Sequence, residues 1–253
     1  MQILLSPAKD MAGDFHCPSD PTEPLFQKRA GEIAAAMDAY SPDEIAGMLK
    51  CGRAIAAGAA TMYKAFFAGA DGLPAWGAYN GIAFKHLGAE TMDAEDSAFA
   101  QGRLWIASPL YGLLRPLDGI RPHRMEAWVR LPGNGGRTMA DYWKPLLTPL
   151  LTAACKDDGG LLLNVASKEM TGLFRWADVE REVEVVEPQF LVQEGGRVKT
   201  VTVYAKMCRG AMARYAIKER IATPSGLEGF THEGFRYSPE HSSPLRPAFV
   251  KRA

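Results

Sequence analysis

The sequence lacks long apolar runs, targeting segments and any extended low-complexity stretch. Its 253 residues contain only short uninterrupted apolar runs, so no segment is long enough to span a membrane as a helix. The start, MQILLSPAKD, has no basic segment and too few apolar residues in a row for a secretory signal. We therefore expect a cytoplasmic protein that makes no membrane contact.

Cysteines are few, and the motifs of several large enzyme classes are absent. The four cysteines have no C-x-x-C pair and no zinc-like spacing against the five histidines; they are Cys17, Cys51, Cys155 and Cys208. The chain also lacks G-x-x-x-x-G-K-[ST], a G-x-G-x-x-G after a strand, H-E-x-x-H and G-x-S-x-G. From these absences we expect no metal site and no cofactor.

Charge is balanced overall but sorted along the chain. Lys and Arg number 29, as do Asp and Glu. Residues 103–144 carry seven Lys or Arg against three acids, and residues 197–220 carry seven against one. Such sorting favours a positive face on a neutral protein, although the charges can also average out on the folded surface.

The pattern of apolar residues predicts one mixed α/β domain over residues 1–253. Apolar runs at 2–6, 103–109 and 160–167 are typical of buried strands. A hairpin is predicted over 183–205, turning at Glu194-Gly195-Gly196 and leading into a helix. After Pro224 we expect strand fragments and a mobile tail. No repeat or linker divides the chain, which favours a single domain. The buried strands predict a central sheet within it.

Three helices are predicted near the N-terminus, at 25–40, 41–50 and 54–69. Ser41 is placed to cap the second helix, with Pro42 at its first position. The short turn between the second and third helices gives the outline of a helix–hairpin–helix element, which any antiparallel helix pair shares. Its candidate residues are Lys50, Gly52, Arg53 and Lys64.

Polar residues collect where the predicted strands end. In α/β sheets ligand sites form at those ends, and hydroxyl, amide and cationic groups there suit phosphate. The residues are Ser6, Lys9, Ser108, Asn164, Ser167, Lys206 and Arg209. Ser6 and Lys9 also have the spacing of a serine–lysine catalytic pair, but Pro7 between them favours a turn.

The stretch LYGLLRPLDGIRPHRMEAW, residues 110–128, is the densest in arginine. Two arginines precede proline, which restricts the backbone and pre-positions a guanidinium for phosphate or carboxylate. The three cations here are Arg115, Arg121 and Arg124. The alternative is an internal ion-pair network with Asp118 and Glu126. His123 is the histidine placed to act as an acid or base.

The stretch YAKMCRGAMARY, residues 204–215, puts three cations on one side of a predicted helix. At 100° per residue Lys206, Arg209 and Arg214 fit an arc of about 140°. Small or apolar residues lie between them on that arc, namely Gly210, Ala213 and Ile217. We expect a basic rim around a floor that a ligand can approach closely. Cys208, flanked by two of the cations, has a lowered thiol pKa on this interpretation, against the alternative of an inert core thiol.

Six motifs occur in a characteristic order: SPAK, LYGLLRPLDGIRPHRME, DYW, NVASKE, YAKMCRGAMARY and GFTHEGFRY. Together they closely resemble the YaaA peroxide-stress family, from Met1 to about Lys251. The resemblance implies a cytoplasmic protein that limits oxidative damage when peroxide and iron meet. It further implies a DNA-binding α/β fold with a positively charged cleft and a helix–hairpin–helix element, and it transfers no catalytic residue.

Two functions follow as hypotheses. In the first, DNA lies in a basic cleft. In the second, an enzyme acts on a nucleotide or other phosphorylated small molecule in the same cleft. The residues expected to bind phosphate or nucleic acid are Ser6, Lys9, Arg115, Arg121, Arg124, Asn164, Ser167, Lys206, Arg209 and Arg214.

Overall fold

A computed structural model describes residues 1–15, 20–68, 72–131 and 135–252. The expected mixed α/β fold with a central sheet is confirmed. The sheet has the order β4-β3-β1-β6-β7, and only β4 runs antiparallel to its neighbour. Its strands are β1 (Gln2–Leu5), β3 (Leu104–Ser108), β4 (Gly112–Leu114), β6 (Leu161–Val165) and β7 (Glu184–Val186). Strands β1, β3 and β6 are buried along their whole length, as their apolar runs predict.

The sheet has a topological switch point between β1 and β6. From β1 the chain leads to β3 on one side, whereas from β6 it leads to β7 on the other. Ligands of open α/β sheets bind at such a point, outside the carboxyl ends of the strands. Leu5 pairs with Val165 in the last register position, so Ser6 and Ser167 leave the sheet close together.

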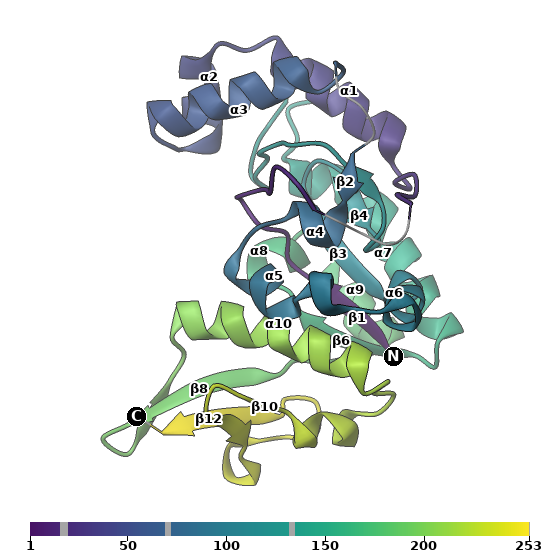
Figure 1. Cartoon of the computed structure of the whole chain (residues 1–253), viewed down its shortest axis with the longest axis vertical. Coiled ribbons are helices and arrows are strands. Elements are labelled where there is room, and N and C mark those ends of the chain that lie inside the picture. Colours follow the sequence, from purple (N-terminus) through teal and green to yellow (C-terminus); the bar gives the residue numbers. More distant parts are fainter. Residues whose placement is uncertain (16–19, 69–71, 132–134, 253) are drawn as a thin grey trace.

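The N-terminal helices form a helical lobe beside the central sheet, at the top of Figure 1. They are α1 (Gln27–Asp38), α2 (Pro42–Leu49) and α3 (Arg53–Ala65). The predicted start of α2 is confirmed, because the Ser41 side chain accepts from the Glu44 N–H while the Glu44 carboxylate accepts from Ser41 N–H. A short turn with Lys50 in the left-handed region (φ 52°) joins α2 to α3.

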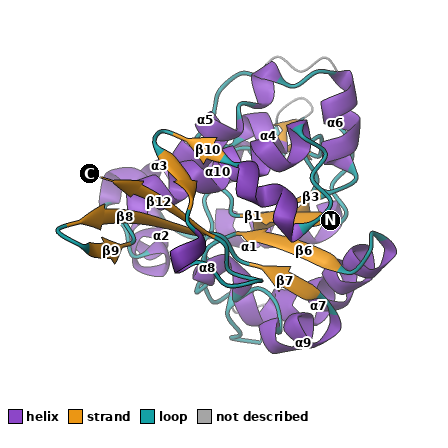
Figure 2. Ribbon diagram, turned by 90° about the horizontal axis from the view of Figure 1, so that it is seen from below, coloured by secondary structure: helices purple, strands orange, loops and turns teal. Residues whose placement is uncertain are grey.

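Helix α10 (Thr202–Lys218) contacts both the central sheet and a second sheet (Figures 1 and 2). This position between layers explains why its residues are apolar on most sides. The second sheet has the order β10-β11-β12-β8-β9. Its strands are β8 (Gln189–Glu194), β9 (Arg197–Lys199), β10 (Thr231–His232), β11 (Phe235–Tyr237) and β12 (Ala248–Arg252).

The predicted hairpin is confirmed at its turn and wrong at both ends. Strands β8 and β9 pair antiparallel, with Glu194 opposite Arg197. The start of the predicted hairpin belongs instead to β7 of the central sheet, since Pro188 lacks the N–H needed to continue a ladder. At the other end, residues 202–205 form the first turn of α10 rather than strand.

The expected mobile tail is also wrong. Strand β12 pairs with β8 in parallel, a contact between segments almost sixty residues apart in the chain. Ala248 and Phe249 are fully buried. Because local sequence carries no signal for such a distant pairing, the tail looked unattached.

The structure describes further short strands and helices. They are β2 (Leu73–Pro74), β5 (Gly119–Ile120), α4 (Ala75–Ala78), α5 (Ile82–Leu87), α6 (Ala94–Gln101), α7 (Met139–Asp157), α8 (Lys168–Thr171), α9 (Trp176–Glu182) and the 3₁₀ turns at 89–91, 224–229 and 239–241. Over the described ranges, no helix combines the length and the apolar character needed to cross a bilayer.

Candidate functional site: a cleft at the switch point

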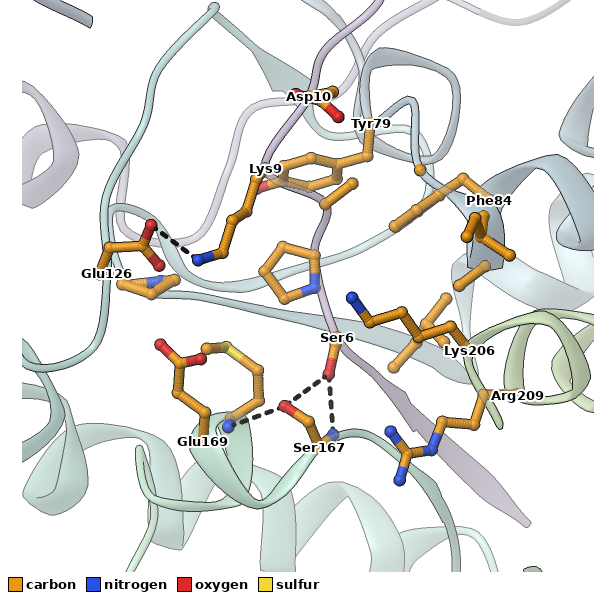
Figure 3. A pocket seen from close by; sticks show the side chains of 18 of the residues that line it. Ser6, Lys9, Asp10, Tyr79, Phe84, Glu126, Ser167, Glu169, Lys206 and Arg209 are labelled. Atoms are coloured by element: carbon orange, nitrogen blue, oxygen red, sulfur yellow. Dashed lines mark hydrogen bonds and ion pairs between the residues drawn. The ribbon is translucent and has the colours of Figure 1, made fainter. Parts of the chain in front are cut away.

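A cavity of about 580 Å³ opens at the β1–β6 switch point. Its walls come from the segment after β1, from α5, from residues 123–126, from the start of α8 and from α10. Figure 3 shows the polar side chains that point into it. Of the residues expected to bind phosphate, the cavity brings together Ser6, Lys9, Arg124, Ser167, Lys206 and Arg209.

Ser6 and Ser167 form the floor of the cleft. Ser167 N–H donates to Ser6 Oγ (2.8 Å), and Ser6 Oγ donates to Ser167 Oγ (3.3 Å). Ser167 also caps α8, because its Oγ accepts from Met170 N–H. The two strand ends are therefore joined by their hydroxyls. Ser6 and Lys9 do not form a catalytic pair, since Lys9 is bound to a carboxylate elsewhere.

Lys206 and Arg209 form the basic wall. Both project from α10 toward the floor serines in Figure 3. Neither makes a hydrogen bond or an ion pair with any residue that the structure describes. Burial lowers the pKa of Arg209, and the charge of Glu187 opposes that shift. A partly buried guanidinium without an internal partner is costly, so this wall is arranged for an anion that arrives from outside.

Glu126 and Glu169 form an acidic wall on the other side of the cavity (Figure 3). Glu126 is buried and is held by Lys9 Nζ (3.0 Å) and an Arg124 guanidinium nitrogen (3.4 Å). Within the described part of the chain, Glu169 accepts a single hydrogen bond, a long one from Ala127 N–H (3.4 Å). Burial, together with repulsion from Glu126, raises the pKa of Glu169. The cleft therefore has two walls of opposite charge.

His123 lines the cavity from a buried position. Its Nδ1 lies 2.7 Å from the Arg121 carbonyl oxygen, so Nδ1 carries the proton and donates. Nε2 is 3.3 Å from the Tyr79 hydroxyl, which in turn is 3.3 Å from Ser108 Oγ. Burial lowers the pKa of His123 to about 4, so the ring is neutral near pH 7. At that pH the ring therefore has no proton on Nε2 to give as an acid.

Arg115 and Arg121 are not among the residues that line the cavity. Arg115 binds fully buried Asp118 through Nε (3.1 Å) and Nη2 (2.9 Å). The Arg121 guanidinium donates to the carbonyl oxygen of Phe66. For Arg115 the internal ion pair, left open by the sequence, is the arrangement that forms. The expectation that both cations line the cleft is wrong.

Arg214 and Gly210 likewise serve packing between α10 and α5. Arg214 donates to the carbonyl oxygens of Leu87 and Gly88, both at 3.1 Å. A Cβ on Gly210 would lie 1.8 Å from the Ala83 carbonyl oxygen. The small residue therefore admits the backbone of α5 rather than a ligand. The predicted three-cation rim is reduced to two cations.

Asn164 lies beneath the cleft without lining it. Its Nδ2 donates to Glu187 Oε1 (2.8 Å), and its Oδ1 accepts from Ala166 N–H (3.0 Å). The side chain thus fixes the chain at the end of β6. It was expected to bind phosphate and instead shapes the segment that carries Ser167.

Cys208 is an inert core thiol. It is fully buried, and burial raises its pKa to about 12 despite the positive charge of Lys251 nearby. The expected lowered pKa is wrong because the flanking cations point away from it, as the helical periodicity requires. Cys17, another cysteine of the sequence, lies outside the described residues.

The residues of the predicted hairpin element are all exposed at the turn or on α3; they are Lys50, Gly52, Arg53 and Lys64. Arg53 forms a surface ion pair with Asp43 (3.0 Å). Lys50 connects the turn to the cleft through Trp128, because Lys50 Nζ and Lys9 Nζ lie 5.8 and 5.6 Å from the centroid of its ring.

The predicted set of binding residues omits several that line the cavity, notably Asp10, Tyr79, Ile82 and Phe84. Three of them belong to the segment from α4 to α5. That segment carries no charge cluster or motif, and it reaches the cleft only because α5 packs on α10. No local signal in the sequence marks it.

Fold and site together define a mixed α/β protein with a cleft that carries both signs of charge at the switch point of its sheet. The family model described as peroxide stress protein YaaA matches residues 1–241, and the chain belongs to that family. A UPF0246 protein of Bacteroides fragilis is 46% identical over 253 residues, covering 99% of this chain and 98% of the relative. UPF0246 proteins of Porphyromonas gingivalis and Cereibacter sphaeroides are 36% and 34% identical, and each alignment covers 99% of both chains.

Proposed function

We propose that the protein binds duplex or distorted DNA through the cations of the cleft and those of the turn between α2 and α3. By binding DNA in this way it would limit iron-dependent oxidative damage in the cytoplasm. The family name supplies peroxide stress as the setting. The observation that supports the proposal most is a series of cations that continues from the cleft to the turn between α2 and α3. No catalytic step is needed for this function.

The series begins at Lys206 and Arg209 and continues with Lys9, which lines the same cavity and is also paired with Glu126. Trp128 then lies within 6 Å of both Lys9 and Lys50, measured from each Nζ to the ring centroid. Such a track suits the phosphates of one strand, because cations spaced along a groove neutralise successive charges and release counterions. An exposed indole between two lysines also suits base stacking.

The test is the salt dependence of binding to a labelled duplex, followed by fluorescence anisotropy. If four to six phosphates are contacted, the slope of log affinity against log salt is about −4 to −5. Lys50→Ala and Arg53→Ala each reduce that slope by about 1. Arg197→Ala, an exposed cation on β9 in the second sheet, is the matched control and leaves it unchanged. A wild-type slope near zero overturns the proposal.

Protection in cells is tested by complementation of a deletion strain under peroxide. Arg209→Glu, at matched protein level, is expected to abolish survival, since it reverses a charge inside the cleft. Arg197→Glu is expected to complement fully. Equal survival with both variants would mean that protection does not run through the cleft.

A second candidate function is an enzyme that acts on a nucleotide or another phosphorylated small molecule. It is favoured by the volume of the cavity, about 580 Å³, which is in the ordinary range for small-molecule sites. The acidic wall also favours it, because a groove that contacts only phosphates gains nothing from carboxylates. Saturable binding of a mononucleotide, combined with a DNA slope near zero, would select this candidate.

A further inference from the structure

The two walls of the cleft set what shape and polarity of ligand fits. Among the residues that the structure describes, Lys206 and Arg209 on one wall have no hydrogen-bond or ion-pair partner, and Glu169 on the other accepts a single long hydrogen bond. A ligand that satisfies both has an anionic end and an end rich in hydrogen-bond donors. An ionised carboxylate accepts hydrogen bonds and cannot donate them, so the second end cannot be another anion.

The floor adds one further donor at the anionic end. Ser167 Oγ already accepts from Ser6 Oγ and from Met170 N–H, while the Ser6 hydroxyl hydrogen is used on Ser167. The hydroxyl hydrogen of Ser167 is thus the one without an acceptor in this group. A phosphate oxygen accepts from hydroxyl and guanidinium groups together, and such charge-assisted bonds are the strong ones.

The cavity is also lined by apolar side chains, among them Pro7, Ile82 and Met125. Ile82 is 38% exposed and offers apolar surface to the cavity. A flat, weakly polar body of moderate size fits such a surface. A phosphate, a flat ring and ring-edge donors occur together in a nucleotide.

We infer that the cavity holds one nucleotide unit, with its phosphate at Lys206 and Arg209 and its base edge at Glu169, and that it prefers bases bearing amino groups. The inference rests on the proposed function, in that the cleft is taken to bind phosphate. Guanine, adenine and cytosine present amino donors to a carboxylate, whereas thymine has no amino group and offers a single ring N–H flanked by two carbonyl oxygens that a carboxylate repels. Glu126 is already bound by Lys9 and Arg124, so Glu169 is the carboxylate left to read the base.

The nucleotide unit has two sources, a free nucleotide or a nucleotide extruded from a DNA strand. The first arm of the test titrates the full-length protein with dGMP, dAMP, dCMP, dTMP and inorganic phosphate by calorimetry at pH 7. The second arm places 2-aminopurine, whose fluorescence rises when it leaves the stack, opposite a mismatch in a duplex. Saturation in the first arm identifies the free nucleotide, and a rise in the second alone identifies the strand.

Three variants locate the two ends. The wild-type protein is expected to bind the best amino-bearing nucleotide at least about tenfold more tightly than dTMP. Glu169→Gln is expected to reduce that ratio below about threefold, since an amide both donates and accepts. Arg209→Ala is expected to weaken all four nucleotides alike, by about tenfold. Glu228→Gln, an exposed carboxylate on the turn after α10, changes neither quantity.

Equal affinity of the wild-type protein for all four nucleotides overturns the inference, whether or not the Glu169 variant folds. Failure of both arms also overturns it. If either result occurs while the duplex still binds with a steep salt slope, the proposal of DNA binding is kept and only the inference of a nucleotide pocket is rejected. If nucleotides are discriminated while the duplex shows no salt-dependent binding, the pocket stands and DNA binding falls.

Discussion

The two basic stretches of this chain carry the same number of cations, and they differ in the cations that they bring to the cleft. In residues 103–144, Arg115 is bound to buried Asp118 and Arg124 reaches Glu126. In residues 197–220, Lys206 and Arg209 extend into the cleft and pair with no described residue. A count of charges cannot distinguish these cases, whereas the presence of an internal ion-pair partner does distinguish them.

The difference has a local cause that can be recognised in a sequence. Asp118 follows Arg115 by three residues within a turn, so its carboxylate accepts both from the Arg115 backbone N–H (2.8 Å) and from the guanidinium. No acid lies within six residues of Arg209 in either direction. A cation with an acidic residue three positions away in a turn indicates a structural ion pair. A cation on a partly buried helix, with no acidic residue nearby in the sequence, indicates a ligand-binding role.

The largest predicted effect separates the two kinds of arginine by stability. Arg115→Ala leaves the carboxylate of Asp118, whose side chain is 0% exposed, without its charged partner. We expect a loss of about 3–5 kcal/mol in the free energy of unfolding, measured by urea denaturation at pH 7. The matched control is Arg53→Ala, which breaks a surface pair and costs about 0–1 kcal/mol. Equal losses would contradict the buried network.

The second prediction concerns how stability depends on pH through His123, a buried residue of the stretch 103–144. Burial lowers the pKa of His123 from 6.5 to about 4, so between these values the unfolded chain binds a proton that the folded chain does not. Stability attributable to His123 is therefore present above pH 6.5. It falls as the pH drops to about 4, by about 1.4 kcal/mol per pH unit.

His123→Gln removes this titration while it keeps hydrogen-bonding groups in place. The difference in unfolding free energy between wild type and variant is expected to shrink as the pH falls through that window. Parallel stability curves for the two proteins, from pH 7 to pH 4, would show that His123 titrates normally in the fold.

The third prediction concerns the second stretch and is the converse of the first. Arg209→Ala is expected to weaken binding of DNA by about 1–3 kcal/mol, the scale of a lost charge-assisted hydrogen bond. The free energy of unfolding is expected to change by no more than about 0.5 kcal/mol, because no internal partner is lost. A variant that unfolds readily but binds DNA normally would show that Arg209 has a structural role like that of Arg115.

The smallest predicted effect concerns Cys208. Because burial raises its pKa to about 12, the thiolate needed for reaction with peroxide is scarce at neutral pH. Cys208→Ala, and replacement of all four cysteines, should leave peroxide survival of a complemented deletion strain intact. Loss of survival with Cys208→Ala alone, at matched protein level, would replace the binding account with a thiol mechanism.

Much of the site was predictable because it depends on local rules. A buried strand that ends in Ser-Pro places Ser6 at a sheet edge, and a second strand that ends in Asn and Ser places Ser167 beside it. The start of α2 followed equally from Ser41 and Pro42. Each of these features needs only a few neighbouring residues to be decided.

The errors occur where distant segments decide the outcome. Arg214 and Gly210 fit the predicted arc of α10, yet α5 covers that side of the helix, and the sequence gives no sign of this contact. The pairing of β12 with β8 has the same character. Helical periodicity tells which residues share a face, but only the packing partner tells whether that face meets solvent or protein.

The most direct test of the central claim is the position of a bound anion. A crystal soaked in tungstate, an analogue of phosphate with strong anomalous scattering, shows which cations are free to take one. We expect a peak between the Lys206 ammonium and the Arg209 guanidinium, above the Ser6–Ser167 floor. A peak beside Arg115 or Arg121, with no tungstate between Lys206 and Arg209 at saturating concentration, would contradict it.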